Sequence, residues 1–254
     1  MSSLAESPSL LAVATRTDES VAVLTVDGVL DTANAAALRD RIMKATLDEP
    51  SAVIVNISTL KVLAESVWST FIGAHWQVRT KPHVPIMLVC ASRATRDALT
   101  RSGVAYFMPV YSTEKAALKA LGQQSRRAVR RADAQLPADL TSLRESRRLV
   151  REWLTTWSQS ALIPVGLVVV NVFVENVLEH TACVPLMRLE SQGTTATIAV
   201  SDDSTSPALR LPSPSSGIDV SGLAIVDALS RAWGSTPTSS GKTVWAVIGP
   251  ENQL

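Results

Sequence analysis

Apolar and polar residues alternate along the first half of the chain in a pattern that predicts strands separated by helices. Apolar runs typical of strands lie at residues 10–15, 21–26, 52–57, 85–90 and 107–110. Apolar residues at helical spacing lie at residues 32–45, 66–78, 94–102 and 112–121. Since only the first two strands are joined by a short polar turn, we expect an α/β domain over residues 9–121. Its sheet should open with a hairpin and be largely parallel after it.

The second half of the chain is organised around a long apolar segment at residues 164–181. It begins with Pro164, which suits the first turn of a helix, and its apolar residues fall at helical spacing. The β-branched run at residues 168–170 would also suit a strand, but the length favours a helix. Further helices are predicted at residues 142–157 and 223–232, and strands at residues 184–191, 195–202 and 243–248. Residues 136–254 should therefore form a two-layer α/β domain with helices on one face of a mixed sheet.

Composition fits two ordinary domains or one large one. The chain has 254 residues, 46% of them hydrophobic, and a formal net charge of +1, which gives no general attraction to nucleic acid. Cys90 and Cys183 are interpreted as reduced thiols, and three scattered histidines do not suggest a zinc site. Residues 1–8 are expected to be disordered and do not resemble a signal peptide. Because no uninterrupted apolar run reaches membrane-spanning length, we expect a cytoplasmic protein.

Residues 122–135 separate the two predicted domains and are rich in arginine. Arg126 and Arg130 are four residues apart, as are Arg127 and Arg131, so a helix here would present a basic face. A nucleic-acid or membrane role is one interpretation of this run. A solvated linker without such a partner is favoured, because the run is short and no aromatic residue is interleaved.

Several motifs follow one another in the second domain. Asn176 and His180 lie four apart on the predicted helix, and they are followed by VSDDS at residues 200–204, SGLAIV at 221–226 and GKTVW at 241–245. The last motif is not a P-loop, because no glycine precedes it at the required spacing. In order and spacing the series resembles the ATP-binding domain of the GHKL class, in the branch of bacterial anti-sigma-factor serine/threonine kinases. The resemblance covers residues 136–249 and implies a Bergerat-type two-layer α/β sandwich.

This resemblance implies positions for ATP and Mg²⁺. Asn176 would provide an oxygen ligand to the metal. Asp202 would accept a hydrogen bond from the adenine amino group, with Asp203 as the less favoured substitute. Gly222 would lie at the phosphates, where a helix begins, and Thr243 would support the adenine end.

The sequence also departs from the kinases at two further positions. Val172 stands where they carry the glutamate that acts as general base, and valine cannot take a proton. Val220 replaces the first of their paired glycines, so its side chain would crowd the phosphates. We therefore expect no catalytic residue, no efficient kinase activity, and binding of ATP and Mg that is weak or absent. Binding of ATP as a structural ligand is the alternative.

The first domain resembles the STAS domain, the fold of anti-sigma factor antagonists. The resemblance covers residues 9–121 and rests on GVLD at residues 28–31, the run at 53–60 and the loop at 62–67. In that family the loop usually carries a serine that a partner kinase phosphorylates, whereas here the phosphoacceptor position is Glu65, followed by Ser66. A carboxylate has roughly half the charge of a phosphate, so Glu65 would mimic phosphoserine in part. The alternative is that the loop has lost its role. Asn56 also stands where an aspartate is common.

The two resemblances together predict a regulatory protein in partner-switching control of a sigma factor, acting by protein–protein binding. The partner would be a sigma factor, an anti-sigma factor antagonist or an anti-sigma kinase, and a homodimer is a further option. One alternative is an active ATP-dependent serine/threonine kinase that phosphorylates an antagonist with a displaced base. Another is a small-molecule sensor that uses the degenerate nucleotide pocket between residues 172 and 243.

Overall fold

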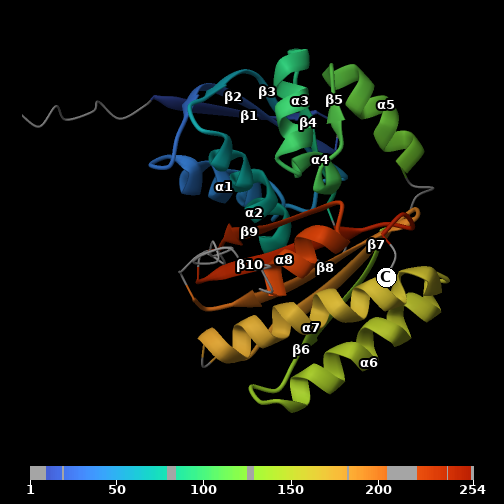
Figure 1. Ribbon diagram of the computed structural model, residues 1–254. Coiled ribbons are helices and arrows are strands. Elements are labelled where there is room, and N and C mark those ends of the chain that lie inside the picture. The colour runs from blue at the N-terminus through green and yellow to red at the C-terminus, as the bar shows by residue number, and fades with distance from the viewer. Residues whose placement is uncertain are drawn as a thin grey trace, which may run out of the picture. The chain divides into compact units, whose positions relative to one another are not determined.

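The computed structural model describes residues 10–252, apart from residues 19, 79–83, 125–128, 182, 205–221 and 239. The chain divides into two compact units, Met1–Ser125 and Arg126–Leu254 (Figure 1). The predicted disordered segment at residues 1–8 lies outside the described residues. Each unit is described below by itself.

The first unit is built on a five-stranded sheet with the order β1-β2-β3-β4-β5. Its strands are β1 (Leu11–Asp18), β2 (Val21–Leu30), β3 (Ala52–Val62), β4 (Ile86–Val89) and β5 (Val110–Tyr111). Strands β1 and β2 form an antiparallel hairpin, and the remaining neighbours are parallel. The predicted α/β sheet with one opening hairpin is therefore confirmed. Gly28 of β2 has φ +110, and a Cβ there would lie 2.1 Å from the Leu10 carbonyl oxygen, so this position of the strand requires glycine.

Helices connect the parallel strands of this unit, and a last helix follows β5. They are α1 (Ala35–Lys44), the 3₁₀ turn η1 (Glu65–Trp68), α2 (Ser69–Gln77), α3 (Arg93–Arg101), α4 (Val104–Phe107) and α5 (Glu114–Gln124). The expected start of α1 at residue 32 is wrong, because Asp31 accepts hydrogen bonds from the backbone of Ala33 and Asn34 and holds a separate turn there. The expected strand at residues 107–110 is also wrong. Phe107 ends the one-turn helix α4, and the strand begins only at Val110.

The second unit is a five-stranded sheet with the order β6-β7-β8-β10-β9 and helices on one face. Its strands are β6 (Arg130–Gln135), β7 (Leu186–Gln192), β8 (Thr195–Asp202), β9 (Ala232–Pro237) and β10 (Lys242–Ile248). Its helices are α6 (Thr141–Thr156), the 3₁₀ turn η2 (Ser160–Leu162), α7 (Ile163–His180) and α8 (Gly222–Leu229). Figure 1 shows α6 and α7 running side by side along the sheet. All four described strand pairs are antiparallel, so the expected mixed sheet is wrong.

The apolar character of α7 is explained by its place in this core. Val170, Phe173 and Val174 are buried, together with Ile198 of β8 and Val244 of β10. By length and composition alone Ser160–His180 could cross a membrane, a test that the core helix of a soluble protein also passes. Burial of its side chains inside the second unit gives the hydrophobic stretch a packing role.

The described parts of the arginine-rich segment 122–135 belong to elements of the two units, since residues 122–124 end α5 and most of the remainder forms β6. Residues 130–135 form β6, so a basic helical face is excluded there. The Arg130 guanidinium donates to the Trp157 carbonyl oxygen (2.6 Å) just after α6, where a cation satisfies a free helix carbonyl. Arg131 pairs with Glu190 on the neighbouring strand at 2.5 Å, and burial lowers the pKa of this guanidinium while Glu190 raises it. Arg126 and Arg127 lie outside the described residues.

The edge strand β9 was not predicted, as β6 was not. The predicted helix at residues 223–232 ends as α8 at Leu229, and Ala232–Pro237 forms the edge strand β9. The Trp233 indole donates to Asp227 at 2.7 Å and links the strand back to the helix. Gly234 pairs opposite Trp245, and a Cβ there would lie 2.8 Å from that indole ring, so glycine makes room for a large neighbour.

Candidate functional site

The loop after β3 places Glu65 on the surface of the first unit. Ala64 has extended backbone angles, and Glu65 is the first residue of η1. The Glu65 side chain is 76% exposed, and its Oε1 lies 3.4 Å from Nη2 of Arg101, which is itself 63% exposed. The Glu65 carboxylate, which the sequence predicts at the phosphoacceptor position, therefore faces solvent with a single loose ion pair among the described residues.

Ser66 lies in the same turn, which is held in place by a hydrogen bond and by buried side chains. Its carbonyl oxygen accepts a hydrogen bond from the Ser69 hydroxyl at 2.7 Å. The next two residues, Val67 and Trp68, are buried, and the Trp68 ring stacks on Phe71 with centroids 6.0 Å apart. The buried pair fixes the backbone of the turn, so the exposed residues are presented from a defined position.

Asn56, at the position where an aspartate is common, has a local reason for its amide. Its Nδ2 donates to Glu114 Oε1 at 2.9 Å, and its Oδ1 accepts from the Ser58 backbone N–H at 3.1 Å. Glu114 also pairs with Arg16. An aspartate here would face another carboxylate without a donor, so asparagine matches its neighbour.

On α7, Val172 and Asn176 lie one helical turn apart. Val172 is buried against the start of α8, because a Cβ built on Gly222 would lie only 2.8 Å from Val172 Cγ1. The side chain that replaces the expected general base thus packs directly on the glycine that was expected at the phosphates. The Asn176 amide is half-buried and has no hydrogen-bond partner among the described residues.

The carboxylate nearest in sequence to Asn176 is engaged elsewhere. Glu175 Oε1 accepts a hydrogen bond from Asn171 Nδ2 at 2.6 Å, and Arg147 of α6 donates to the Asn171 oxygen. This chain of polar contacts links α7 to α6, so Glu175 contributes to the packing of the two helices. No group of three or more metal-binding side chains occurs among the described residues.

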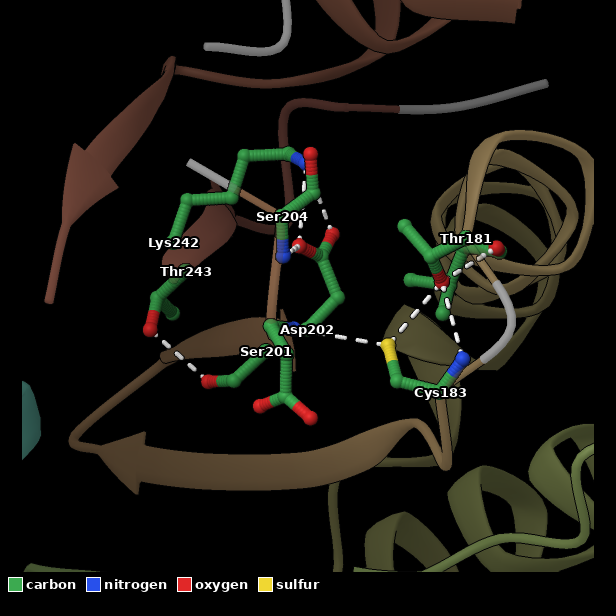
Figure 2. A network of polar contacts seen from close by, with 9 residues as sticks. Thr181, Cys183, Ser201, Asp202, Ser204, Lys242 and Thr243 are labelled. Carbon is green, nitrogen blue, oxygen red and sulfur yellow. Dashed lines mark hydrogen bonds and ion pairs between the residues drawn. The ribbon is translucent and has the colours of Figure 1, made fainter. Parts of the chain in front are cut away.

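At the end of β8, Asp202 is buried and paired with a lysine (Figure 2). Lys242 Nζ lies 2.9 Å from each carboxylate oxygen, and the Ser204 backbone N–H donates to Oδ1 at 2.8 Å. Asp202 and Lys242 are directly opposite in the antiparallel β8–β10 pair. Their side chains are 2% and 10% exposed, so this ion pair belongs to the interior of the unit.

Thr243 does not lie with Asp202. Its hydroxyl is 2.7 Å from the Ser201 hydroxyl (Figure 2), and both residues fall one step away from the Asp202–Lys242 pair along their strands. Successive side chains of a strand point to opposite faces, so Thr243 is on the other face of the sheet. Asp202 and Thr243, both expected at an adenine end, therefore lie on opposite faces of the sheet, and Lys242 is the residue opposite Asp202.

A cysteine borders the same end of the sheet. Cys183 Sγ accepts from the Asp203 backbone N–H at 3.4 Å and lies 2.9 Å from the Thr181 hydroxyl at the end of α7 (Figure 2). Sequence reasoning treated Cys183 only as a buried thiol and gave Lys242 no role. The signal for Lys242 was present, because pairing the predicted strands 195–202 and 243–248 antiparallel brings their neighbouring ends together.

Comparison with known proteins identifies the first unit. The STAS domain family model matches residues 12–117. Among solved structures, an anti-sigma factor antagonist from Mycobacterium paratuberculosis is 23% identical, with 46% of this chain and 97% of that one covered and a TM-score of 0.41. RsbS from Moorella thermoacetica is 18% identical, with 45% and 97% covered and a TM-score of 0.38.

A structure of RsbU and RsbW domains from Mycobacterium tuberculosis is 20% identical, with 47% of this chain and 32% of that one covered and a TM-score of 0.37. The comparison with curated proteins finds no match. On the family match and the fold of its first unit, the chain contains a STAS domain at residues 12–117.

Proposed function

We propose that this protein regulates a sigma factor by partner switching and acts through protein–protein binding. The observation that carries the proposal is the exposed Glu65 carboxylate at the phosphoacceptor-equivalent position of a STAS domain. Solved proteins similar to the first unit include anti-sigma factor antagonists. The partners we propose are a sigma factor, an anti-sigma factor antagonist or an anti-sigma kinase.

A fixed carboxylate would hold the STAS domain in one signalling state. Glu65 supplies negative charge without a kinase, and no phosphatase can remove it. The STAS resemblance implies that phosphorylation of the antagonist weakens its binding to the kinase. The domain would therefore behave as a partly phosphorylated antagonist at all times.

We propose that the second unit is a GHKL-type module, similar to an anti-sigma kinase, that has lost phosphoryl transfer. Its helices on one face of a sheet and its motif order support this assignment. Val172 supports the loss, since an apolar side chain cannot accept the proton of a substrate hydroxyl. Its side chain also packs against Gly222, at the start of α8. Such a module would retain surfaces for docking without turnover.

Affinity capture with the tagged full-length chain tests this function. We expect mass spectrometry of the captured proteins to show enrichment of a sigma factor, an antagonist or an anti-sigma kinase. Glu65→Ser, which removes the charge, should change the affinity for the enriched partner by about tenfold. Asp97→Ser is the matched control, because Asp97 is an exposed carboxylate on α3 outside the loop. Failure to enrich any of these three protein classes would reject the proposal.

A further inference from the structure

Three contacts occupy the buried carboxylate of Asp202. Lys242 Nζ lies 2.9 Å from both oxygens, and the Ser204 backbone N–H reaches Oδ1 at 2.8 Å. With its side chain only 2% exposed, Asp202 has little access to water. An ionised carboxylate offers about four acceptor positions, so most of its hydrogen-bonding capacity is used within the chain.

Backbone packing holds Lys242 in this place. Gly241, the preceding residue, approaches β8 so closely that a Cβ there would lie 2.0 Å from the Asp202 carbonyl oxygen. Lys242 then begins β10 directly opposite Asp202. Asp202 and Lys242 both lie on the helix-covered face, in register with the buried side chains of Val200 and Val244. The ammonium group is therefore positioned by two strands and a close turn.

The adenine-binding role implied by the GHKL resemblance does not fit this arrangement. An adenine amino group is a neutral donor, whereas Lys242 supplies a charge-assisted pair that is roughly twice as strong. Adenine would have to displace a buried ammonium group and leave it without its counter-ion, which is strongly unfavourable. We propose that Lys242 is a specificity-determining residue that prevents adenine from binding to Asp202, because it occupies the carboxylate itself. This inference rests on the proposed GHKL-type assignment of the second unit, and it does not depend on the identity of the regulatory partner.

Nucleoside titration of the full-length chain, followed by amide NMR shifts, tests the exclusion. Adenosine is the probe because it lacks phosphates, so the loss of the phosphate-binding glycine at residue 220 does not enter. Inosine is the matched control, since a carbonyl replaces the amino group that Asp202 would recognise. We expect the wild-type chain to bind neither nucleoside. Lys242→Thr should give saturable amide shifts with adenosine, at a concentration at least about tenfold below the highest at which the wild type shows none, and no gain for inosine.

Binding of adenosine to the wild-type chain would overturn the proposal. A folded Lys242→Thr chain with no gain, or with an equal gain for inosine, would also overturn it. The amide spectrum reports whether the variant is folded.

If the variant is unfolded, trace acylation of lysines in the wild-type chain provides the test. Lys242 should react far more slowly than the exposed Lys119, with or without adenosine. Equal rates, or a rate for Lys242 that changes when adenosine is added, would refute the exclusion. A negative result in these assays would not bear on the proposed regulatory function, because the affinity-capture assay that tests it uses no nucleoside.

Discussion

Each unit has a carboxylate at its candidate site, and the two carboxylates differ in exposure and in how they are paired. Glu65 of the first unit is 76% exposed and has one loose ion pair, with Arg101 at 3.4 Å. Asp202 of the second unit is 2% exposed and is held by Lys242 at 2.9 Å. The first carboxylate remains available to another molecule, while the second is neutralised inside its own fold.

This difference shows that a carboxylate at a motif position can be accommodated for two separate physical reasons. An exposed charge costs little and stabilises little, so its position on an anchored turn suits recognition. A buried charge must be paired, and removing its partner is costly. The predictions below probe that contrast, beginning with the largest expected effect.

Removing the lysine should destabilise the second unit strongly. Lys242→Met leaves the Asp202 carboxylate buried without its counter-ion, and we expect a loss of about 3–5 kcal/mol in the free energy of unfolding. Urea unfolding followed by circular dichroism measures the change. Lys119→Met, at an exposed position, is the control and should be nearly neutral. Adding Asp202→Asn to Lys242→Met should recover part of the loss, and no recovery would argue against the ion pair as its cause.

The contact between α7 and α8 should produce the next largest effect. Gly222→Ala places a methyl group 2.8 Å from Val172 Cγ1, so we expect a loss of about 1–3 kcal/mol in unfolding free energy. In a Val172→Ala background the same substitution should cost much less, because space is available. A double-mutant cycle by chemical denaturation gives the coupling. Additive effects would mean that Val172 and Gly222 do not pack together.

Glu251 provides an intermediate case, exposed yet bound by Arg231 in two contacts. The side-chain hydrogen bond from Arg231 lowers the pKa of Glu251 to about 2 from its ordinary value of 4.5. A lowered folded-state pKa gives stability that is fully present above pH 4.5 and is lost as the pH falls through about 2. Arg231→Gln should return the pKa toward 4.5, as measured by carboxyl NMR titration. An unchanged pKa would show that Arg231 does not stabilise the charge.

The smallest effect on stability is expected at the exposed loop. Glu65→Gln breaks an ion pair between two largely exposed side chains, so the free energy of unfolding should change by less than about 0.5 kcal/mol. Urea denaturation of wild type and variant, with Asp97→Asn for comparison, measures this. A loss as large as that for Lys242→Met would make Glu65 a structural residue and remove the contrast between the two units.

Much of the fold could be predicted because local pattern decided it. The hairpin and parallel strands of the first unit and the helix at residues 164–181 had clear apolar periodicity. Strand β6 was missed because its sequence, RRADAQ, is polar. It is held in the sheet by cross-strand pairs of Arg131 with Glu190 and Asp133 with Arg188. Strand β9 was missed because its Gly234 and Pro237 are poor strand formers, and pairing with β10 outweighs that tendency.

The sequence predicted which residues form the candidate sites better than it predicted the contacts that those residues make. The sequence indicated Glu65 as a surface charge on a loop, and the structure places it there. The motif identified Asp202 as a candidate site residue. Its ion-pair partner Lys242 could not be predicted in the same way, because the pairing depends on the register between two strands. The same limit applies to Thr243. The face of the sheet on which its side chain lies depends on the register of β10 against β8.

Carboxyl labelling of the intact full-length chain tests the central contrast most directly. A water-soluble carbodiimide and a small amine convert accessible carboxylates to amides, and peptide mass spectrometry reads each site in the same sample. We predict rapid labelling of Glu65 and strong protection of Asp202 in the folded chain, with protection lost in urea. Labelling of Asp202 at the rate of Glu65 under native conditions would contradict the account.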